Sequence, residues 1–348
     1  MFKPKYTISD KIIGQLTQIA VSRDIIERAK LVPKWELTLR KDALIHAAHS
    51  STHIEGNQLT LEEVSQLALG REVSAMRRDK QEVLNYLNVL SHLEKYLPKN
   101  AFSEALLLKI HRDLVKQALT NSADEGVFRN RAVVIGHRNE EGRTIVTFRP
   151  PPASAVPELI QNFVAWLNNP KTKQIHAVLV AGVAHYEFVR IHPVVDGNGR
   201  TARVLATLIL FAQGFDTRRF FALDDYYDSD RIAYYDALKS VNPKTLDLTH
   251  WLEYFSEGVA FTVGRVREKI EQLGQGKRRS DSEIQVSLTE RQVSIVEAIS
   301  RSGKITSREM QMMFKISAQA VHKEMRKLLE QKVVRLAGKG RSAQYELI

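Results

Sequence analysis

The chain has 348 residues, of which 43% are hydrophobic and 26% charged, the balance of a globular protein of two or three domains. It contains no cysteine, which excludes disulfides and thiolate metal sites. No apolar run is long enough to cross a bilayer, and residues 1–5 lack the apolar stretch of a signal peptide. We therefore expect a cytoplasmic protein with no membrane partner.

Positive charge is concentrated near the C-terminus. The formal net charge is +11, and the part from Phe261 onward has 18 Lys and Arg against 10 Asp and Glu, so it carries +8 of that total. Such a basic module favours a polyanionic partner, with nucleic acid first in line. A basic but merely soluble surface is the alternative, and charge alone does not decide between them.

Helical periodicity dominates the first 273 residues. Apolar residues recur at a spacing of about 3.6 in ten segments: 8–30, 37–51, 60–70, 78–97, 103–119, 156–168, 175–189, 200–213, 231–241 and 248–273. Strand signals are sparse. The clearest are 132–135 and 144–148, which we interpret as a hairpin closed by a polar loop, with the prolines at 150–152 ending it. The pattern predicts a mainly α fold.

A different pattern follows a polar, basic linker at residues 274–282. Thr289 and Thr306 each begin a capping-box pattern that opens a helix, and a third helix is predicted at 317–331. Strands are predicted at 333–336 and 342–347, and the Gly-rich turn between them makes the pattern of a hairpin. Three helices followed by a hairpin is typical of a winged helix-turn-helix.

The most informative segment lies between two predicted helices, at residues 191–203. Gly197 and Gly199 flank Asn198, so the backbone can turn tightly and present its N–H groups. Because these amides open a helix, they form a natural anion site.

Four side chains surround this glycine turn. Arg200 and Arg203 are spaced i and i+3, so they share a helix face and can both reach phosphate oxygens. Asp196 is suited to bind Mg²⁺ beside bound phosphates, and a neutral His192 could take a proton from a hydroxyl. Each residue alone has a structural explanation, since a histidine often ends a helix and Gly-Asn-Gly often makes a turn. Their combination is much harder to explain as packing.

This segment resembles the signature of the Fic family, in which His-Pro-Phe is followed by an acidic residue, Gly-Asn-Gly-Arg and a second arginine. Val194 replaces the usual phenylalanine, which we expect to loosen the loop packing without abolishing chemistry. The resemblance implies an all-helical core with a β-hairpin flap. It also implies transfer of AMP from ATP to a Ser, Thr or Tyr hydroxyl of a target protein.

The resemblance also assigns roles. His192 would deprotonate the target hydroxyl and Asp196 would hold Mg²⁺. The polyphosphate would be held by the loop and its helix, with the second arginine at the γ-phosphate: Gly197, Asn198, Gly199, Arg200 and Arg203.

A second segment, Ser51 to Asn57, looks like the Fic inhibitory motif, in which Ser or Thr is followed four residues later by Glu and then Gly or Asn. In the family this glutamate, here Glu55, pairs with the second motif arginine, here Arg203, and blocks the γ-phosphate. One guanidinium cannot serve a carboxylate and a phosphate at once. The alternative is a plain helix end with Gly56 as its cap.

Weaker matches extend the resemblance over residues 35–260. The hairpin corresponds to the flap that pins a target segment as an added strand. Tyr235 could stack on adenine and Asn242 could bond to phosphate or ribose, whereas helix packing is the alternative for Tyr234 and Tyr235.

The predicted domains are an N-terminal helical region at 1–100 with the inhibitory motif at 51–56, a Fic catalytic core at 101–260, a helix end and linker at 261–284, and a winged helix domain at 285–348. The last would bind DNA through its third helix and wing, or instead mediate protein contacts. The exposed residues expected to do so are Gln319, His322, Lys323, Arg326, Lys339 and Arg341.

Three functions remain open at this stage. The first is a self-inhibited AMP transferase, which could also modify itself and could act as a homodimer. The second is a DNA-binding transcriptional regulator whose Fic core senses nucleotide. The third is transfer of another nucleotide, or removal of AMP with Glu55 positioning water.

Overall fold

The computed structural model describes residues 2–29, 31, 33–138, 144–215, 219–276, 288–302, 304–331, 333–338 and 343–347. The chain divides into two compact units, one made of Met1–Arg23 with Ala43–Arg265 and the other of Asp24–Asp42 with Val266–Ile348. In the described part, no helix is both long and apolar enough to cross a membrane. The predicted domain boundaries stay predictions.

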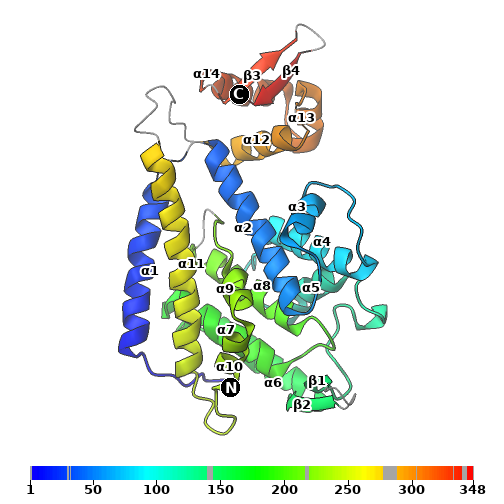
Figure 1. Ribbon diagram of the computed structural model, residues 1–348, viewed down its shortest axis with the longest axis vertical. Helices are drawn as coiled ribbons and strands as arrows, with labels where there is room; N and C mark the ends of the chain where they lie inside the picture. Colours follow the sequence, from blue (N-terminus) through cyan, green and yellow to red (C-terminus); the bar gives the residue numbers. More distant parts are fainter. Residues whose placement is uncertain are drawn as a thin grey trace. The chain divides into compact units, whose positions relative to one another are not determined.

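Helices make up most of the chain up to Gly276, and three of them continue from one unit into the other along the sequence (Figure 1). In chain order they are α1 (Asp10–Arg28), α2 (Pro33–Ile54), α3 (Leu61–Ala68), α4 (Arg77–Ser91), α5 (Glu104–Val115), α6 (Val156–Leu167), α7 (Ala177–Ile191), α8 (Asn198–Ala212), α9 (Leu223–Ser229), α10 (Arg231–Lys239) and α11 (Thr249–Gly276). Short 3₁₀ turns lie at Leu93–Tyr96, Ser122–Asp124, Ala153–Ala155 and Thr172–Gln174. The predicted mainly helical class is confirmed.

Two details of the helices differ from the periodicity. The single helix expected at 78–97 is interrupted after Ser91, where the ring of His92 hydrogen-bonds the carbonyl of Asn88 at 2.9 Å. A side chain that satisfies a carbonyl in the last turn favours a helix end there. Helix α9 was not predicted, because seven residues are too short for a clear helical period.

The predicted hairpin forms, but its first strand is displaced. Strand β1 (Ile135–Arg138) pairs antiparallel with β2 (Thr144–Phe148), so the prediction of a strand at 132–135 was wrong by three residues. Gly136 pairs with Val146 and lies so close to the Ile145 carbonyl that a Cβ would not fit. Gly136, which the sequence pattern placed in the closing loop, is therefore part of the β1–β2 hydrogen-bond ladder. The predicted closing loop lies largely outside the described residues.

The core of the first unit is centred on α8, which packs closely on α7 and α5. Val204 and Leu208 of α8 are fully buried in one cluster with Ile110 and Leu114 of α5, joined by apolar residues of α2, α3 and α4. This packing fixes the ends of α7 and α8. The motif loop, which joins those two ends, is held on a rigid base as a result.

The second unit contains α12 (Glu290–Ser302), α13 (Ser307–Phe314), α14 (Ala318–Glu330) and a hairpin of β3 (Val334–Ala337) and β4 (Gln344–Leu347). Both expected capping pairs form, Thr289 with Gln292 and Thr306 with Glu309. The order of elements is the predicted one, and the assignment to a winged helix stays a prediction. Most of the linker, together with Lys339 and Arg341, lies outside the described residues.

Candidate active site

The motif loop begins where α7 ends, at His192. This residue has a φ of +49°, in the left-handed region that few side chains adopt. A buried arginine, Arg129, holds it there: its Nε donates to the His192 carbonyl at 2.7 Å and its Nη2 to the Ile191 carbonyl at 3.4 Å. The same Nη2 donates to the Pro151 carbonyl at 2.6 Å, so Arg129 joins the loop to the segment that follows the hairpin.

The side chain of His192 is arranged as a base. Its Nδ1 lies 3.4 Å from the carbonyl of Val189, an acceptor that favours the proton on Nδ1 and leaves a lone pair on Nε2. Burial, helped by the charge of Arg129, outweighs the hydrogen bond to Val189 and lowers the pKa of His192 to about 4. The imidazole is therefore neutral at physiological pH and able to accept a proton.

Two buried side chains fix the shape of the loop. Asn198 bonds the Val194 backbone in both directions, donating to its carbonyl at 2.9 Å and accepting from its N–H at 3.1 Å. His111 accepts from the Gly126 N–H at 3.1 Å, so its Nε2–H donates to the Asp196 carbonyl at 3.0 Å. The Asn198 amide thus faces the loop backbone. Val194 is buried, with 1% of its surface exposed, despite its small size.

Glycine is needed at both ends of the turn that opens α8. Gly197 has a φ of +83°, and a Cβ there would come within 2.7 Å of Val115. At Gly199 a Cβ would overlap the carboxylate of Glu55. The carboxylate therefore lies against the N-terminal turn of α8, the place where sequence reasoning expects an anion.

Arg203, the second motif arginine, is enclosed by the segment from Ser51 to Asn57. Its Nη2 donates to Glu55 Oε1 at 2.8 Å and to the Ser51 carbonyl at 2.9 Å, while Nε donates to Ser51 Oγ at 2.7 Å. Burial alone would lower the pKa of Arg203, but the charge of Glu55 and of neighbouring acidic groups raises it overall. Ser51, Glu55 and Arg203, predicted from two distant segments, thus meet. Gly56 follows with a φ of +96°, so it also caps α2.

A buried aspartate that the sequence analysis missed completes this cluster. Asp224, on the unpredicted helix α9, lies 3.4 Å from Arg203 Nε and accepts a hydrogen bond from Tyr86 at 3.1 Å. Burial raises the pKa of Asp224, and the Arg203 charge opposes this. Arg203 is therefore held by two carboxylates. Sequence reasoning could have found Asp224 only by predicting helix α9, and this helix is too short to show a clear helical period.

Arg200, the first motif arginine, is also paired with two carboxylates. Its Nη2 lies 3.2 Å from Asp196 Oδ1, and its Nη1 lies 3.0 Å from Glu82 Oε1 on α4. Arg200 and Glu82 are 1% and 5% exposed, which places this ion pair away from solvent. Asn57, just after the inhibitory glutamate, donates to Glu82 Oε2 at 3.3 Å. Sequence reasoning did not assign Glu82 a role.

The carboxylates near the motif loop offer a metal ion one suitable ligand and no complete set of ligands. In the described ranges no cluster of three or more His, Cys, Asp or Glu could hold a metal ion. Asp196, whose side chain is 41% exposed, is the carboxylate beside the α8 N-terminus. A single carboxylate suits Mg²⁺, which commonly takes its remaining ligands from phosphate oxygens and water.

The predicted adenine-side residues divide into three cases. Tyr234 is 2% exposed and its hydroxyl lies 2.9 Å from the ring of buried His185, so packing accounts for it. Tyr235 is 40% exposed, and burial raises the pKa of its hydroxyl, as does the charge of Glu55. Asn242 is exposed and caps its own turn through the Lys244 N–H at 2.8 Å.

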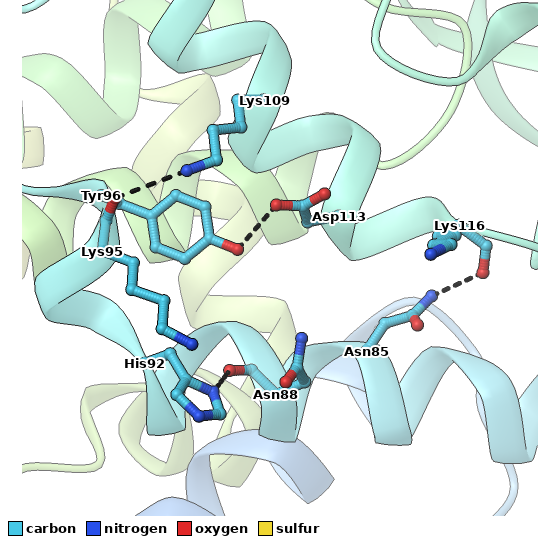
Figure 2. Close-up of a pocket in the computed structure, with 8 residues that line it drawn as sticks. All are labelled: Asn85, Asn88, His92, Lys95, Tyr96, Lys109, Asp113 and Lys116. Carbon is cyan, nitrogen blue, oxygen red and sulfur yellow. Dashed lines mark hydrogen bonds between the residues drawn. The ribbon is translucent and has the colours of Figure 1, made fainter. Parts of the chain in front are cut away.

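A separate hollow of about 280 Å³ lies between α4 and α5 and is lined by none of the motif residues. Figure 2 shows Lys95 and Lys109 beside Tyr96, whose hydroxyl donates to Asp113 at 2.8 Å. Lys109 also lies over the Tyr96 ring at 4.7 Å. The hollow is polar and open to solvent, and it does not belong to the catalytic constellation.

Comparison with known proteins agrees with this geometry. Residues 101–210 match the Fic/DOC family. That range includes His192, the glycine turn and both motif arginines. Glu55 and Ser51 precede it.

Curated relatives carry the name protein adenylyltransferase Fic. Those of Drosophila mojavensis and Drosophila virilis are 30% and 31% identical over 179 residues, which is 51% of this chain. The matches cover 33% and 34% of those proteins, so the chain spans about a third of the length of the curated relatives. Homology to a transferase family is shown over that region.

Solved structures share the fold. A Fic family protein from Desulfovibrio desulfuricans G20 matches with a TM-score of 0.66 and 24% identity, covering 100% of this chain and 98% of that one. Residues 134–508 of Fic-1 from C. elegans match with a TM-score of 0.57 and 23% identity, covering 76% of this chain and 74% of that one. These likenesses concern the fold alone.

Proposed function

We propose that the protein is a protein adenylyltransferase, which transfers AMP from ATP to a hydroxyl of a target protein, and that Glu55 inhibits it. The observation that carries the proposal is the loop joining α7 to α8. It combines a neutral, buried imidazole with a free Nε2 and a glycine-rich helix N-terminus that bears two arginines. Homology to proteins named adenylyltransferase supports this reaction class.

The chain's own groups perform simple tasks in this reaction. His192 Nε2 takes the proton of the target hydroxyl, whose oxygen attacks the α-phosphorus while pyrophosphate leaves. The amides that open α8, with Arg200 and Arg203, bind the phosphate oxygens and stabilise the charge that develops on them. Asp196 would hold Mg²⁺, which neutralises phosphate charge when bound.

Inhibition follows from competition for one guanidinium. Arg203 donates to Glu55 and Ser51, so a phosphate can reach it only if the Glu55 carboxylate withdraws. Glu55 also lies on the turn of α8 where phosphate oxygens would bind. The side chain of Glu55 is 30% exposed, so it can leave without unfolding the core.

The test uses α-³²P-ATP and Mg²⁺ with wild type, Glu55→Gly, and Glu55→Gly combined with His192→Ala. Label on the protein itself should be faint in the wild type, strong in the single variant and absent in the double variant. Retained transfer in the double variant would exclude His192 as the base. No label in any of them, with ATP binding established separately, would favour AMP removal, another nucleotide donor or the regulator.

A second function, DNA binding, is favoured by one surface of the second unit. Four polar or basic side chains of α14 are exposed, as the sequence predicts: Gln319, His322, Lys323 and Arg326. A helix of this kind could enter a major groove. A gel shift with random duplex DNA, repeated with the Lys323→Glu and Arg326→Glu double variant, tests this. Equal binding by both proteins would contradict a role for α14.

A further inference from the structure

Asp196, the carboxylate assigned to Mg²⁺, has protein partners on both of its oxygens. Asp196 Oδ1 accepts from the Gly197 N–H at 2.5 Å and lies 3.2 Å from Arg200 Nη2. Asp196 Oδ2 lies 3.2 Å from Nη2 of Arg78, the second residue of α4. Arg78 is outside the motif, and no sequence signal assigned it a role.

These contacts close into a ring of four charged side chains. Arg78 Nε donates to Glu82 Oε1 at 3.1 Å, and the same oxygen lies 3.0 Å from Arg200 Nη1. Each carboxylate in the ring is therefore shared between two guanidiniums, and the ring has no net charge. Arg78 and Glu82 are spaced i and i+4, so α4 presents both to the loop from one face.

The four members differ in how easily they can move. Arg200 and Glu82 are almost fully buried, and losing either partner would leave a buried charge unpaired. Arg78 is different, because 55% of its side chain is exposed. An exposed guanidinium can return to water at little cost. Arg78 is thus the member that can release Asp196 while the ring's buried pair stays intact.

We propose that Arg78 is a positioning residue that holds Asp196 in the resting protein, and that this ion pair opens when Asp196 binds Mg²⁺ with a nucleotide. The proposal rests on the function proposed above. It describes a restraint separate from Glu55, since Glu55 acts on Arg203, whereas Arg78 acts on the metal carboxylate. Removing Arg78 should lower the Mg²⁺ requirement for nucleotide binding.

The chain offers a matched control one residue away. Arg77 begins α4 and is exposed, and it has no hydrogen bond or ion pair among the described residues. Arg77→Ala removes one positive charge from the same helix without removing a contact to Asp196, so it measures the effect of the lost charge by itself. Arg78→Ala removes that charge together with the contact to Asp196.

The experiment measures ADP binding by isothermal titration calorimetry over a series of Mg²⁺ concentrations, in the Glu55→Gly background. We expect Arg78→Ala to lower the Mg²⁺ concentration for half-maximal ADP binding about two- to fivefold. This range follows because the half-exposed Arg78–Asp196 ion pair is weak and, in the variant, no longer competes with Mg²⁺ for Asp196. Arg77→Ala should change it much less. Equal shifts in both variants, no shift, or a higher Mg²⁺ requirement in Arg78→Ala would overturn the proposal while leaving the adenylyltransferase function standing. Absence of Mg²⁺-dependent binding in the parent would overturn both.

Discussion

Glu55 and Gly199 are matched in shape, because the Glu55 carboxylate occupies the space that a Cβ on residue 199 would need. The same carboxylate reaches Arg203 Nη2 at 2.8 Å. The absence of a side chain at position 199 therefore lets the segment that carries Glu55 and helix α8 approach each other. The glycine that is suited to phosphate binding also makes room for the Glu55 carboxylate.

Gly199→Ala should consequently be costly only while Glu55 is present. The added methyl group forces the flexible Glu55 carboxylate away from Arg203, and the loss of a hydrogen bond between charged groups costs about 1.5–3 kcal/mol of unfolding free energy. In Glu55→Gly the same substitution should cost less than about 1 kcal/mol, because alanine suits a helix better than glycine. Urea denaturation of the four proteins of this cycle measures the difference.

The control for this cycle is Gly14→Ala in α1, where a Cβ meets no atom within 4 Å. That substitution should be neutral or slightly stabilising in both backgrounds. Equal costs of Gly199→Ala with and without Glu55 would contradict the steric relationship.

Ser51→Ala should partly relieve inhibition. The Ser51 hydroxyl accepts from Arg203 Nε at 2.7 Å, and its loss removes one of the bonds that hold the guanidinium while leaving those to Glu55 and to the Ser51 carbonyl. Since one hydrogen bond to a charged group contributes about 1.5–3 kcal/mol, AMP transfer should rise but stay below that of Glu55→Gly. Labelling with α-³²P-ATP compares the three proteins.

Ser50→Ala is the matched comparison, because the Ser50 hydroxyl bonds Asp225 at 2.6 Å and makes no contact with Arg203. Both serine variants should lose stability, but only Ser51→Ala should gain activity. A similar gain in Ser50→Ala would indicate that any loosening of α2 relieves inhibition.

Local signals were enough to predict most of the helices and the motif residues. His192, Asp196 and the two arginines lie within one loop and the first two turns of one helix, so their spacing in the chain already determines their proximity. The meeting of Ser51 and Glu55 with Arg203 was predicted only through family resemblance. No local pattern relates two segments that are 148 residues apart.

The residues that sequence reasoning missed act through tertiary packing. Arg78 and Glu82 reach the loop because α4 packs beside α5, and Asp224 reaches Arg203 from a helix too short to show a period. The displaced strand β1 has the same kind of cause. Gly136 joins a ladder because its partner backbone approaches closely, which composition alone does not reveal.

Arg129→Lys should destabilise the protein and lower transfer with little change in ATP affinity. Arg129 donates to the carbonyls of His192, Ile191 and Pro151, and a lysine cannot reproduce this planar fork. Buried carbonyls left without donors cost about 1–3 kcal/mol each, so a loss of at least about 2 kcal/mol is expected.

Because Arg129 holds the His192 backbone, Arg129→Lys should displace the base and leave the phosphate-binding turn in place. We therefore expect the substitution to lower kcat for AMP transfer. Steady-state kinetics in the Glu55→Gly background separates the two, with Arg131→Lys as a control, since Arg131 is half exposed and its guanidinium pairs with Asp124. A rise in KM for ATP at unchanged kcat would contradict this role.

The imidazole of His192 should remain neutral well below the pH at which an ordinary histidine titrates. Burial and the charge of Arg129 lower its pKa to about 4, whereas the unfolded chain protonates near 6.5. The base should therefore stay active as pH falls through 6.5 and lose its function only near 4. Folding stability behaves differently: the unfolded state takes up the proton first, so His192 destabilises the fold progressively between pH 6.5 and 4.

Two measurements check this pair of statements. The NMR resonance of the His192 ring, assigned by its absence in His192→Gln, should not shift between pH 8 and about 5.5, a range well above the lowered pKa. The fall in unfolding free energy between pH 7 and 5 should be smaller in His192→Gln than in the wild type, because the variant has no proton to gain at this position. A titration midpoint near 6.5 would show that the ring is solvated, and the assignment of His192 as a buried neutral base would then be wrong.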